Sequence, residues 1–260
     1  MNLSGRRAIV TGANGNLGRV IVSTLAELGA DVILVDLPGK KMQIFADETS
    51  ETYSVETQCL VCDLESEVDR NNLISEVKSF KLGVDILVNN AAFVGDSNLT
   101  GWIDNFEEQS LKTWRRAIEV NLTSAFHLCQ AFTPDLKKSV GGSIINIASI
   151  YGQFGPDWRL YEDNNMGNPA AYGVSKGGLV QFTRWLATTI APDVRVNSIS
   201  PGGIFRNQPA EFVKKYSSRT PLGRMAVEQD FKGAIAFLAS DLSSYLTGQI
   251  LRVDGGWGEW

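Results

Sequence analysis

A tyrosine and a lysine stand four positions apart, at Tyr172 and Lys176, where apolar residues recur with helical spacing. Residues four apart share one helix face, with their Cβ atoms about 5–6 Å from each other. Because a nearby ammonium group stabilises a phenolate, Lys176 is expected to lower the pKa of Tyr172 from about 10 towards neutrality. A tyrosine with such a pKa could act as a general acid or base near pH 7. The spacing is also common on surface helices, so this interpretation depends on the accompanying motifs.

A glycine-rich segment, Thr11–Gly18, lies between a short apolar run and a helical pattern. Glycines permit a tight turn and let the backbone approach a pyrophosphate, which the free N–H groups of the following helix would face. Many glycine-rich turns bind nothing, but a strand before and a helix after are the context that nucleotide binding requires. The segment therefore predicts a dinucleotide site at the start of the fold.

Acidic residues end the next two predicted strands. Asp36 comes eighteen positions after Gly18, where a carboxylate can accept hydrogen bonds from ribose hydroxyls and would repel a 2′-phosphate. No arginine follows directly, and Lys40 and Lys41 come slightly later. We therefore expect NAD in preference to NADP, with a solvated strand-end acid as the alternative. Asp63 could hydrogen-bond the adenine amino group or cap a helix.

Short β-branched runs alternate with helical patterns along the whole chain. The predicted strands are Ala8–Thr11, Asp31–Asp36, Gln58–Cys62, Asp85–Asn89, Gly142–Ala148, Val194–Ile199 and Gln249–Val253. The predicted helices are Leu17–Leu28, Glu65–Phe80, Leu111–Leu136, Ala170–Ala191 and Glu228–Leu242. Irregular structure is expected at 38–57, 93–110, 151–169 and 202–227. Nearly all-apolar strands indicate a parallel sheet covered on both faces, so we expect one doubly wound α/β domain over residues 1–260, with about seven strands in three α/β/α layers.

The composition argues against several classes of protein. The 260 residues include 24 Lys and Arg against 29 Asp and Glu, a formal net charge of −5. A mildly acidic chain is a poor partner for nucleic acids or anionic membranes. No apolar run reaches the ~18–20 residues that a membrane span needs. The polar start predicts no signal peptide, so a cytoplasmic protein is expected.

The histidine and cysteines predict no metal site. His127 is the single histidine, which excludes mechanisms that need two, and a structural or surface role is expected for it. The odd number of cysteines, Cys59, Cys62 and Cys129, favours reduced thiols. Cys59 and Cys62 have CxxC spacing, but positions three apart in a strand point to opposite faces. We therefore expect both to pack in the core.

Together these motifs resemble those of the short-chain dehydrogenase/reductase family. The matching residues cover nearly the whole chain in order: Thr11, Gly12, Gly18, Asp63, Asn89, Asn90, Ala91, Asn121, Ser149, Tyr172, Lys176, Asn197, Pro201, Gly202 and the terminal motif from Thr247 to Gly256. The resemblance implies a Rossmann-type fold. It also implies hydride transfer between a nicotinamide cofactor and a carbon that bears a hydroxyl or carbonyl group.

The resemblance further implies roles for individual residues. Tyr172 would be the general acid or base, and Lys176 would bind the nicotinamide ribose and lower the tyrosine pKa. Ser149 would orient the substrate oxygen, and Asn121 would hold a water in a proton relay. Asn121 interrupts an apolar helix, so a purely structural role is its alternative. The implied cofactor-binding residues are Gly12, Asn14, Asn16, Leu17, Gly18, Asp36, Asp63, Leu64, Asn90, Ala91, Tyr172, Lys176, Pro201, Gly203 and Ile204.

The sequence departs from the family pattern in three places. Asn16 stands where a glycine is usual, although Gly15 beside it could supply the same turn. Ala92 follows Ala91 where the motif usually ends in glycine. Arg206 falls near the position of the usual threonine that contacts the carboxamide. These departures leave the pyrophosphate and carboxamide contacts open.

The stretch from Ser149 to Tyr172 spans 172 − 149 = 23 positions, which is longer than the family usually shows. Because it leaves a strand end beside the reactive residues, 151–169 is expected to wall the active site together with 202–227. The candidate substrate residues offer stacking and hydrogen bonding suited to a polyhydroxylated or anionic ligand: Tyr151, Trp158, Arg159, Glu162, Arg206 and Asn207. A surface insertion or a subunit contact is the alternative.

This stretch, together with Pro201–Ile204, Asn207–Gln208 and Asp254–Trp257, resembles a family branch associated with flagellin modification, in bacterial sugar pathways that lead to nine-carbon acidic sugars. The prediction is therefore an NAD-dependent oxidoreductase that interconverts an alcohol and a ketone on a carbohydrate-like substrate. The alternatives are a 3-oxoacyl or generic carbonyl reductase that uses NADPH, and a non-catalytic NAD-binding regulator. Trp257 and Trp260, near the end of the chain, favour a dimer or tetramer, with packing inside the monomer as the alternative.

Overall fold

A seven-stranded parallel sheet forms the centre of the fold in the computed structural model, which describes residues 1–95, 99–162 and 164–260. The strand order is β3-β2-β1-β4-β5-β6-β7. The strands are β1 (Arg7–Thr11), β2 (Asp31–Asp36), β3 (Thr57–Val61), β4 (Ile86–Asn89), β5 (Gly142–Ile147), β6 (Val194–Pro201) and β7 (Ile250–Val253). Because the order reverses between β1 and β4, a crevice opens at their carboxyl ends, where ligands of such sheets bind. The predicted Rossmann-type doubly wound fold is confirmed.

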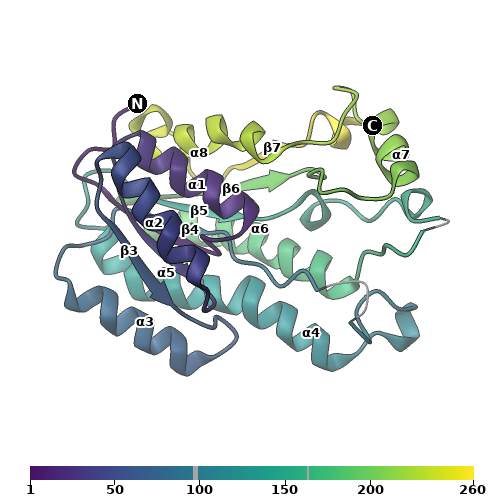
Figure 1. The fold of residues 1–260 in the computed structure, drawn as a ribbon, viewed down its shortest axis with the longest axis horizontal. Helices are drawn as coiled ribbons and strands as arrows, with labels where there is room; N and C mark the ends of the chain where they lie inside the picture. Colours follow the sequence, from purple (N-terminus) through teal and green to yellow (C-terminus); the bar gives the residue numbers. More distant parts are fainter. Residues whose placement is uncertain (96–98, 163) are drawn as a thin grey trace.

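Helices cover both faces of the sheet (Figure 1). One face carries α1 (Asn16–Glu27), α2 (Lys40–Tyr53) and α8 (Lys232–Ala239). The other carries α3 (Glu67–Ser79), α5 (Ser124–Leu136) and α6 (Ala170–Ile190). A π-helix (Glu119–Thr123) joins α4 (Leu111–Ile118) to α5, and α7 (Ala210–Arg219) lies near the C-terminus. The 3₁₀ helices are Phe106–Glu108, Ile150–Gly152, Trp158–Leu160, Glu228–Phe231, Asp241–Ser243 and Trp257–Glu259.

The strands are buried on both faces, as their apolar sequences predict. In β2, Val32 and Leu34 pack with α1 and α2, whereas Ile33 packs with the helices of the opposite face. Cys59 and Cys62 follow the same alternation, because Cys59 contacts the first cluster and Cys62 belongs to the second. The CxxC spacing is therefore a core pattern. Among the described residues, no group of three or more His, Cys, Asp and Glu side chains is placed to hold a metal ion.

Two helices lie in segments that were expected to be irregular, and one predicted helix is interrupted. In α2, Met42, Phe45 and Ala46 face the core at helical spacing. In α7, Phe212 and Tyr216 do the same. Both helices consist mostly of polar residues and bury few apolar ones, so each offers few apolar positions from which to predict a helix. The predicted helix 111–136 contains the π-helix, in which the helical turn that includes Asn121 is wider than an α-helical turn.

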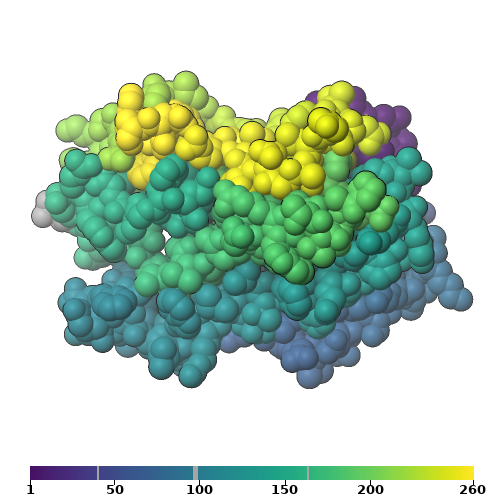
Figure 2. Space-filling view, turned by 180° about the vertical axis from the view of Figure 1, so that it is seen from behind, coloured from purple at the N-terminus to yellow at the C-terminus, as the bar shows by residue number. Residues whose placement is uncertain are grey.

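The end of the chain returns to the body of the protein. In the space-filling view from behind, the yellow C-terminal segment lies against green residues (Figure 2). Inside the protein, β7 pairs with β6. Trp257 is buried and stacks on Tyr216, so it packs inside the monomer. Trp260 is 72 % exposed, although its indole N–H donates to the carbonyl of Arg219. Of the two tryptophans that favoured an oligomer, only Trp260 is therefore exposed and available for a subunit contact. Within the described residues, no helix combines the length and the apolar character needed to span a bilayer.

Candidate active site

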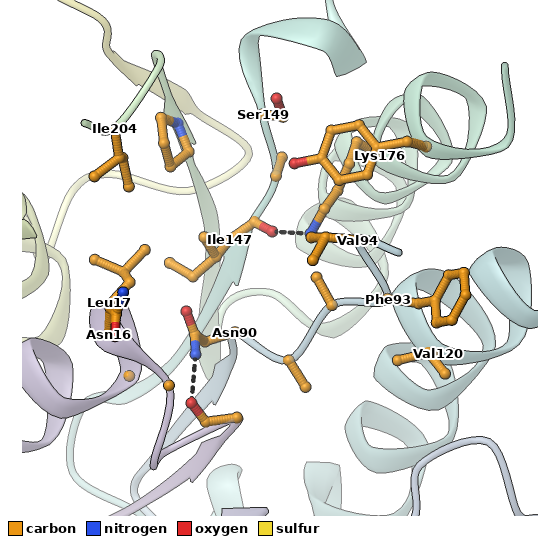
Figure 3. A pocket seen from close by; sticks show the side chains of 18 of the residues that line it. Asn16, Leu17, Asn90, Phe93, Val94, Val120, Ile147, Ser149, Lys176 and Ile204 are labelled. Carbon is orange, nitrogen blue, oxygen red and sulfur yellow. Dashed lines mark hydrogen bonds between the residues drawn. The ribbon is translucent and has the colours of Figure 1, made fainter. Parts of the chain in front are cut away.

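A cavity of about 770 Å³ lies at the carboxyl ends of the strands. It brings together residues from opposite ends of the sequence: Gly12, Asn14, Asn16, Leu17, Gly18, Asp36, Asp63, Leu64, Asn90, Ala91, Ser149, Tyr151, Tyr172, Lys176, Pro201, Gly203, Ile204 and Arg206. These include every residue expected to bind the cofactor. Asn16 and Leu17 lie across the cavity from Ser149 and Lys176 (Figure 3).

The glycine-rich turn fits a pyrophosphate. Gly12 has φ +63°, and a Cβ there would lie 2.8 Å from the Cα of Ala91. A Cβ on Gly18 would lie 1.9 Å from the carbonyl oxygen of Gly12, so only glycine allows the first turn of α1 to approach the loop. The N-cap residue of α1 is Gly15, which has no side chain to cap the helix, so the first N–H groups of α1 are available for an anion. Asn16 is exposed, so the turn accommodates the residue that departs from the family pattern.

Asn90 and Thr11 fix this turn to the end of β4. The amide of Asn90 donates to the carbonyl oxygens of Thr11 and Gly12, both at 3.0 Å. The hydroxyl of Thr11 accepts from the backbone N–H groups of Asn90 and Ala91 at 3.0 and 3.1 Å. The side chain of Asn90 therefore holds the loop, while its neighbour Ala91 supplies a smooth wall.

Asp36 places a negative charge on the wall of the cavity beyond the turn. Its carboxylate accepts hydrogen bonds from the backbone N–H of Asn14 at 2.7 Å and of Leu37 at 2.8 Å. Each oxygen keeps a further lone pair, so the carboxylate can also accept from ribose hydroxyls. Its position fits the predicted contact with the adenosine ribose.

Ser149, Tyr172 and Lys176 meet at the other end of the cavity. Ser149 follows β5, and the tyrosine and lysine lie in the first turns of α6. Lys176 is only 2 % exposed, and its ammonium donates to the carbonyl oxygen of Ile147 at 2.7 Å (Figure 3). Burial lowers the pKa of Lys176 to about 8. The lysine is thus held at the floor of the cavity by the backbone of β5.

The expectation that Lys176 lowers the pKa of Tyr172 towards neutrality is wrong for this structure. Burial raises the pKa of Tyr172 above its ordinary value. A hydrogen bond with Ser149 and the positive charge of Arg206 oppose this rise without reversing it. The physical reason is that desolvation of the phenolate outweighs these stabilising groups, while the ammonium of Lys176 is directed at Ile147.

Asn121 lies outside the described lining of the cavity. Its side-chain oxygen accepts from the backbone N–H of Phe93 at 2.6 Å, and its amide donates to the hydroxyl of Ser175 at 3.0 Å. These bonds tie the π-helix to the loop after β4 and to α6. They satisfy the hydrogen-bonding groups of a buried side chain, and the place of Asn121 in a proton relay stays a prediction.

Arg70 does not line the cavity but binds the backbone of a residue that does, a contact that the sequence did not reveal. It is 2 % exposed and donates to the carbonyl of Leu64, which lines the cavity, and to Glu119 at 2.6 Å. A third bond reaches the Nδ1 of His127 at 3.3 Å, so the histidine has a structural role. A lone arginine in a polar helix ordinarily indicates a solvated face, and only the tertiary contacts distinguish it.

A second cavity of about 450 Å³ adjoins the first. Val94, Tyr151 and Tyr172 line both cavities. The other lining residues are Trp102, Ile103, Tyr161, Asn165, Met166, Gly167, Asn168, Pro169 and Pro209. Only part of the predicted wall 151–169 lines a cavity, namely Tyr151, Tyr161 and 165–169, and residue 163 lies outside the described residues.

Four of the candidate substrate residues lie outside the lining of both cavities. Trp158 is 58 % exposed, and Asn207 lies in a turn with φ +59°. Arg159 pairs with Asp157 at 2.7 Å, and Glu162 lies 3.9 Å from the ammonium of Lys215. Tyr151 and Arg206 do line the first cavity. Only two of the six candidate substrate residues therefore line a cavity that also contains Tyr172.

The sequence also matches a family model described as enoyl-(acyl carrier protein) reductase over residues 12–258. The chain belongs to the short-chain dehydrogenase/reductase family. It is therefore an oxidoreductase that acts on CH–OH groups, as the resemblance implied. Members of this family bind NAD or NADP.

Relatives within the short-chain dehydrogenase/reductase family differ in substrate and cofactor. The chain is 33 % identical over 261 residues to a 3-oxoacyl-(acyl carrier protein) reductase of Aquifex aeolicus, covering 98 % of each protein. An NADPH-dependent 3-quinuclidinone reductase of Rhodotorula rubra has a TM-score of 0.87 and 26 % identity, covering 100 % of this chain and 93 % of the other. A NAD⁺-bound xylitol dehydrogenase has a TM-score of 0.86 and 28 % identity, covering 98 % of this chain and 100 % of the other. These names leave substrate and cofactor open.

Proposed function

We propose that this protein is an NAD-dependent oxidoreductase that interconverts a secondary alcohol and a ketone. The observation that carries the proposal is the position of Ser149, Tyr172 and Lys176 on one cavity with the glycine-rich turn and Asp36. A phenol, a hydroxyl and a buried ammonium beside a dinucleotide site are the groups that such a reaction needs.

In the reducing direction, the hydroxyl of Tyr172 donates a proton to the carbonyl oxygen of the substrate, and in the oxidising direction the phenolate takes that proton back. Ser149 orients the same oxygen, and Lys176 holds the ribose next to the reacting carbon. The nicotinamide, when bound, supplies or accepts the hydride. Asn121 positions α6 through Ser175. Arg206 contributes a positive charge that favours the phenolate.

The proposed reaction does not by itself specify the class of substrate. The carbohydrate-like substrate and the branch associated with flagellin modification remain predictions, and three of the residues that suggested them, Trp158, Arg159 and Glu162, do not line the cavities. The name of the Aquifex aeolicus relative is compatible with the 3-oxoacyl alternative. Assembly into a dimer or tetramer also remains a prediction.

Deuterium transfer tests the proposed reaction directly. NADH dideuterated at C4 is incubated with the protein and, separately, with cyclohexanone, fructose and a 3-oxobutanoyl thioester. Ketone, reduced cofactor and a proton give alcohol and oxidised cofactor, so mass spectrometry should find one deuterium on the carbinol carbon of at least one product. If NADH binds and no product in this panel carries deuterium, the proposed interconversion of a ketone and a secondary alcohol with this cofactor is wrong.

The charge of Asp36 should make the protein prefer NADH to NADPH. Because the 2′-phosphate would meet this carboxylate, NADPH is expected to bind at least about tenfold more weakly, a difference of about 1.4 kcal/mol. Asp36→Asn keeps the side-chain size and should reduce the preference about tenfold. Fluorescence titration with both cofactors measures the ratio.

The control for this prediction lies at the other end of the same strand. Asp31 begins β2, outside the lining of the cavity, and binds the backbone N–H of Glu56. Asp31→Asn removes the same charge and should leave the ratio of the two dissociation constants unchanged. Equal or tighter binding of NADPH by the wild type would contradict the assignment of NAD.

A further inference from the structure

We propose that the smaller cavity beside Tyr172 receives an apolar ring or chain attached to the reacting carbon, so that the substrate is an apolar ketone or secondary alcohol and not a sugar. This inference rests on the proposed function, because it assumes that Tyr172 is the proton donor. It specifies which part of the substrate occupies which cavity.

The position of the cavity makes it the place where a substrate body must lie. Tyr172 forms part of its wall and also part of the wall of the larger cavity. A carbonyl oxygen at the tyrosine hydroxyl would leave the larger cavity to the dinucleotide, which extends towards the glycine-rich turn. The substituents of the carbonyl carbon then point into the space of about 450 Å³, a volume typical of small-molecule pockets.

The wall of this cavity offers few groups to a polar ligand. Among the described lining residues, none is charged. The hydroxyls of Tyr151 and Tyr161 bond to each other at 2.8 Å, and the latter also accepts from Asn168 at 3.4 Å. The indole N–H of Trp102 donates to the carbonyl of Val94 at 2.8 Å. The polar atoms are thus largely paired within the wall, which leaves the apolar faces of the rings for the ligand.

A sugar would fit such a wall poorly. Each hydroxyl that enters the cavity loses hydrogen bonds to water and needs a partner in return. Asn165 and Asn168 are the amide side chains of the described lining that could offer one. A polyhydroxylated ring would therefore keep several hydroxyls unpaired, whereas each buried methylene group gains affinity.

The wall is also preformed, because a ladder of aromatic rings supports it from behind. Tyr161 packs on Phe212 at 5.7 Å between ring centroids, and Phe212 stacks on Tyr216 at 6.1 Å. Tyr216 in turn stacks on Trp257 at 6.1 Å. These contacts join segment 151–169 to α7 and the C-terminal end. A rigid apolar wall selects by shape and polarity, since it cannot rearrange to pair a polar group.

The charged residues of the same segment act outside the cavity. Asp157 accepts from Arg159 at 2.7 Å and also pairs with Arg219 of α7. The guanidinium of Arg219 lies 4.7 Å from the ring centre of Trp257. These contacts fasten segment 151–169 to α7 and to the buried Trp257. Their role is to hold the apolar wall in place.

A series of 4-substituted cyclohexanones tests the inference, because the carbonyl group stays the same along the series. With NADH, kcat/KM should rise about fourfold for each added methylene group from cyclohexanone through 4-methyl, 4-ethyl and 4-propyl derivatives, until the cavity is filled. The decisive pair is 4-methylcyclohexanone and 4-hydroxycyclohexanone, which differ little in size. The methyl compound should be preferred about tenfold.

Met166→Asp supplies the matched variant, because it places a carboxylate in the apolar wall. Met166→Asp should abolish the increase of kcat/KM with alkyl length and reduce the preference for the methyl compound about tenfold. Met166→Leu should retain both the increase and the preference. Leu82→Asp adds the same charge at an exposed site outside both cavities and should change neither. Titration of the NADH-saturated protein with 4-propylcyclohexanol measures the same selectivity as binding alone.

The outcomes separate this inference from the proposed function. Deuterium transfer to fructose or 4-hydroxycyclohexanone in preference to the alkyl ketones would overturn the inference and leave the proposed function intact. A missing deuterium transfer to every ketone would overturn both. The kcat/KM values of the wild-type protein for the cyclohexanone series decide between a polar and an apolar pocket even if Met166→Asp does not fold.

Discussion

Replacing Tyr172 with phenylalanine is expected to lower kcat by about 10²–10⁴-fold and to leave the dissociation constant for NADH nearly unchanged. The variant removes the hydroxyl that exchanges a proton with the substrate oxygen. It keeps the ring that lines both cavities, so the walls should retain their shape. Steady-state kinetics with a ketone that accepts deuterium, together with calorimetric titration of NADH, separates the two quantities.

The pH profile adds a readout that a structural role would not produce. Burial raises the pKa of Tyr172, so the phenol is protonated near neutral pH. Ketone reduction uses the protonated form and should persist to alkaline pH, whereas alcohol oxidation uses the phenolate and should rise with pH. The residual activity of Tyr172→Phe should lack this rise.

Tyr245→Phe provides the matched control, because Tyr245 is fully exposed and lies outside both cavities. This variant should keep both the rate and the pH profile of the wild type. An active Tyr172→Phe protein with an unchanged profile would remove Tyr172 from the mechanism. Loss of NADH binding in the same variant would instead assign the tyrosine to the cofactor site.

The parts of the site that sequence could predict are those whose geometry is set within a few residues. The turn from Gly12 to Gly18 follows from the backbone freedom of glycine and from the helix that begins at Asn16. Tyr172 and Lys176 lie on one helix face as soon as α6 is helical, because they are four residues apart. Ser149 and Asp36 follow strands, and parallel strands end at one edge of the sheet. The fold class then brings these local features together.

The remaining features arise from contacts between segments far apart in the sequence. The raised pKa of Tyr172 depends on burial and on the bond between Lys176 and Ile147, neither of which has a local signal. The second cavity exists because 151–169 packs on α7 through aromatic rings. The sequence showed Trp158 and Arg159 as residues able to bind a sugar, but it could not show that they face solvent and Asp157. The residue types indicated which interactions the side chains can make, but only the packing determines where those side chains point.

Replacing Gly18 with alanine is expected to weaken NADH binding by at least about 100-fold, which corresponds to about 2.7 kcal/mol. A Cβ at this position would lie 1.9 Å from the carbonyl oxygen of Gly12, so the loop must move. That oxygen also accepts hydrogen bonds from Asn90 at 3.0 Å and from the N–H of Gly15 at 3.2 Å. Moving it disrupts the turn that faces the pyrophosphate. Calorimetric titration of NADH measures the loss.

Two further glycine variants distinguish a local effect on the loop from a general effect on stability. Gly15→Ala brings a Cβ to 3.3 Å from the same oxygen, a closeness that a small shift relieves, so binding should fall only severalfold. Gly233→Ala in α8 brings its Cβ within 4 Å of no atom of the described residues and should leave binding unchanged. The melting temperature of Gly18→Ala should fall by several degrees, since overpacking typically costs about 1–3 kcal/mol. If Gly18→Ala binds NADH as tightly as Gly233→Ala, the pyrophosphate cannot lie against this turn, because the shifted loop would no longer present the N–H groups that the assignment requires.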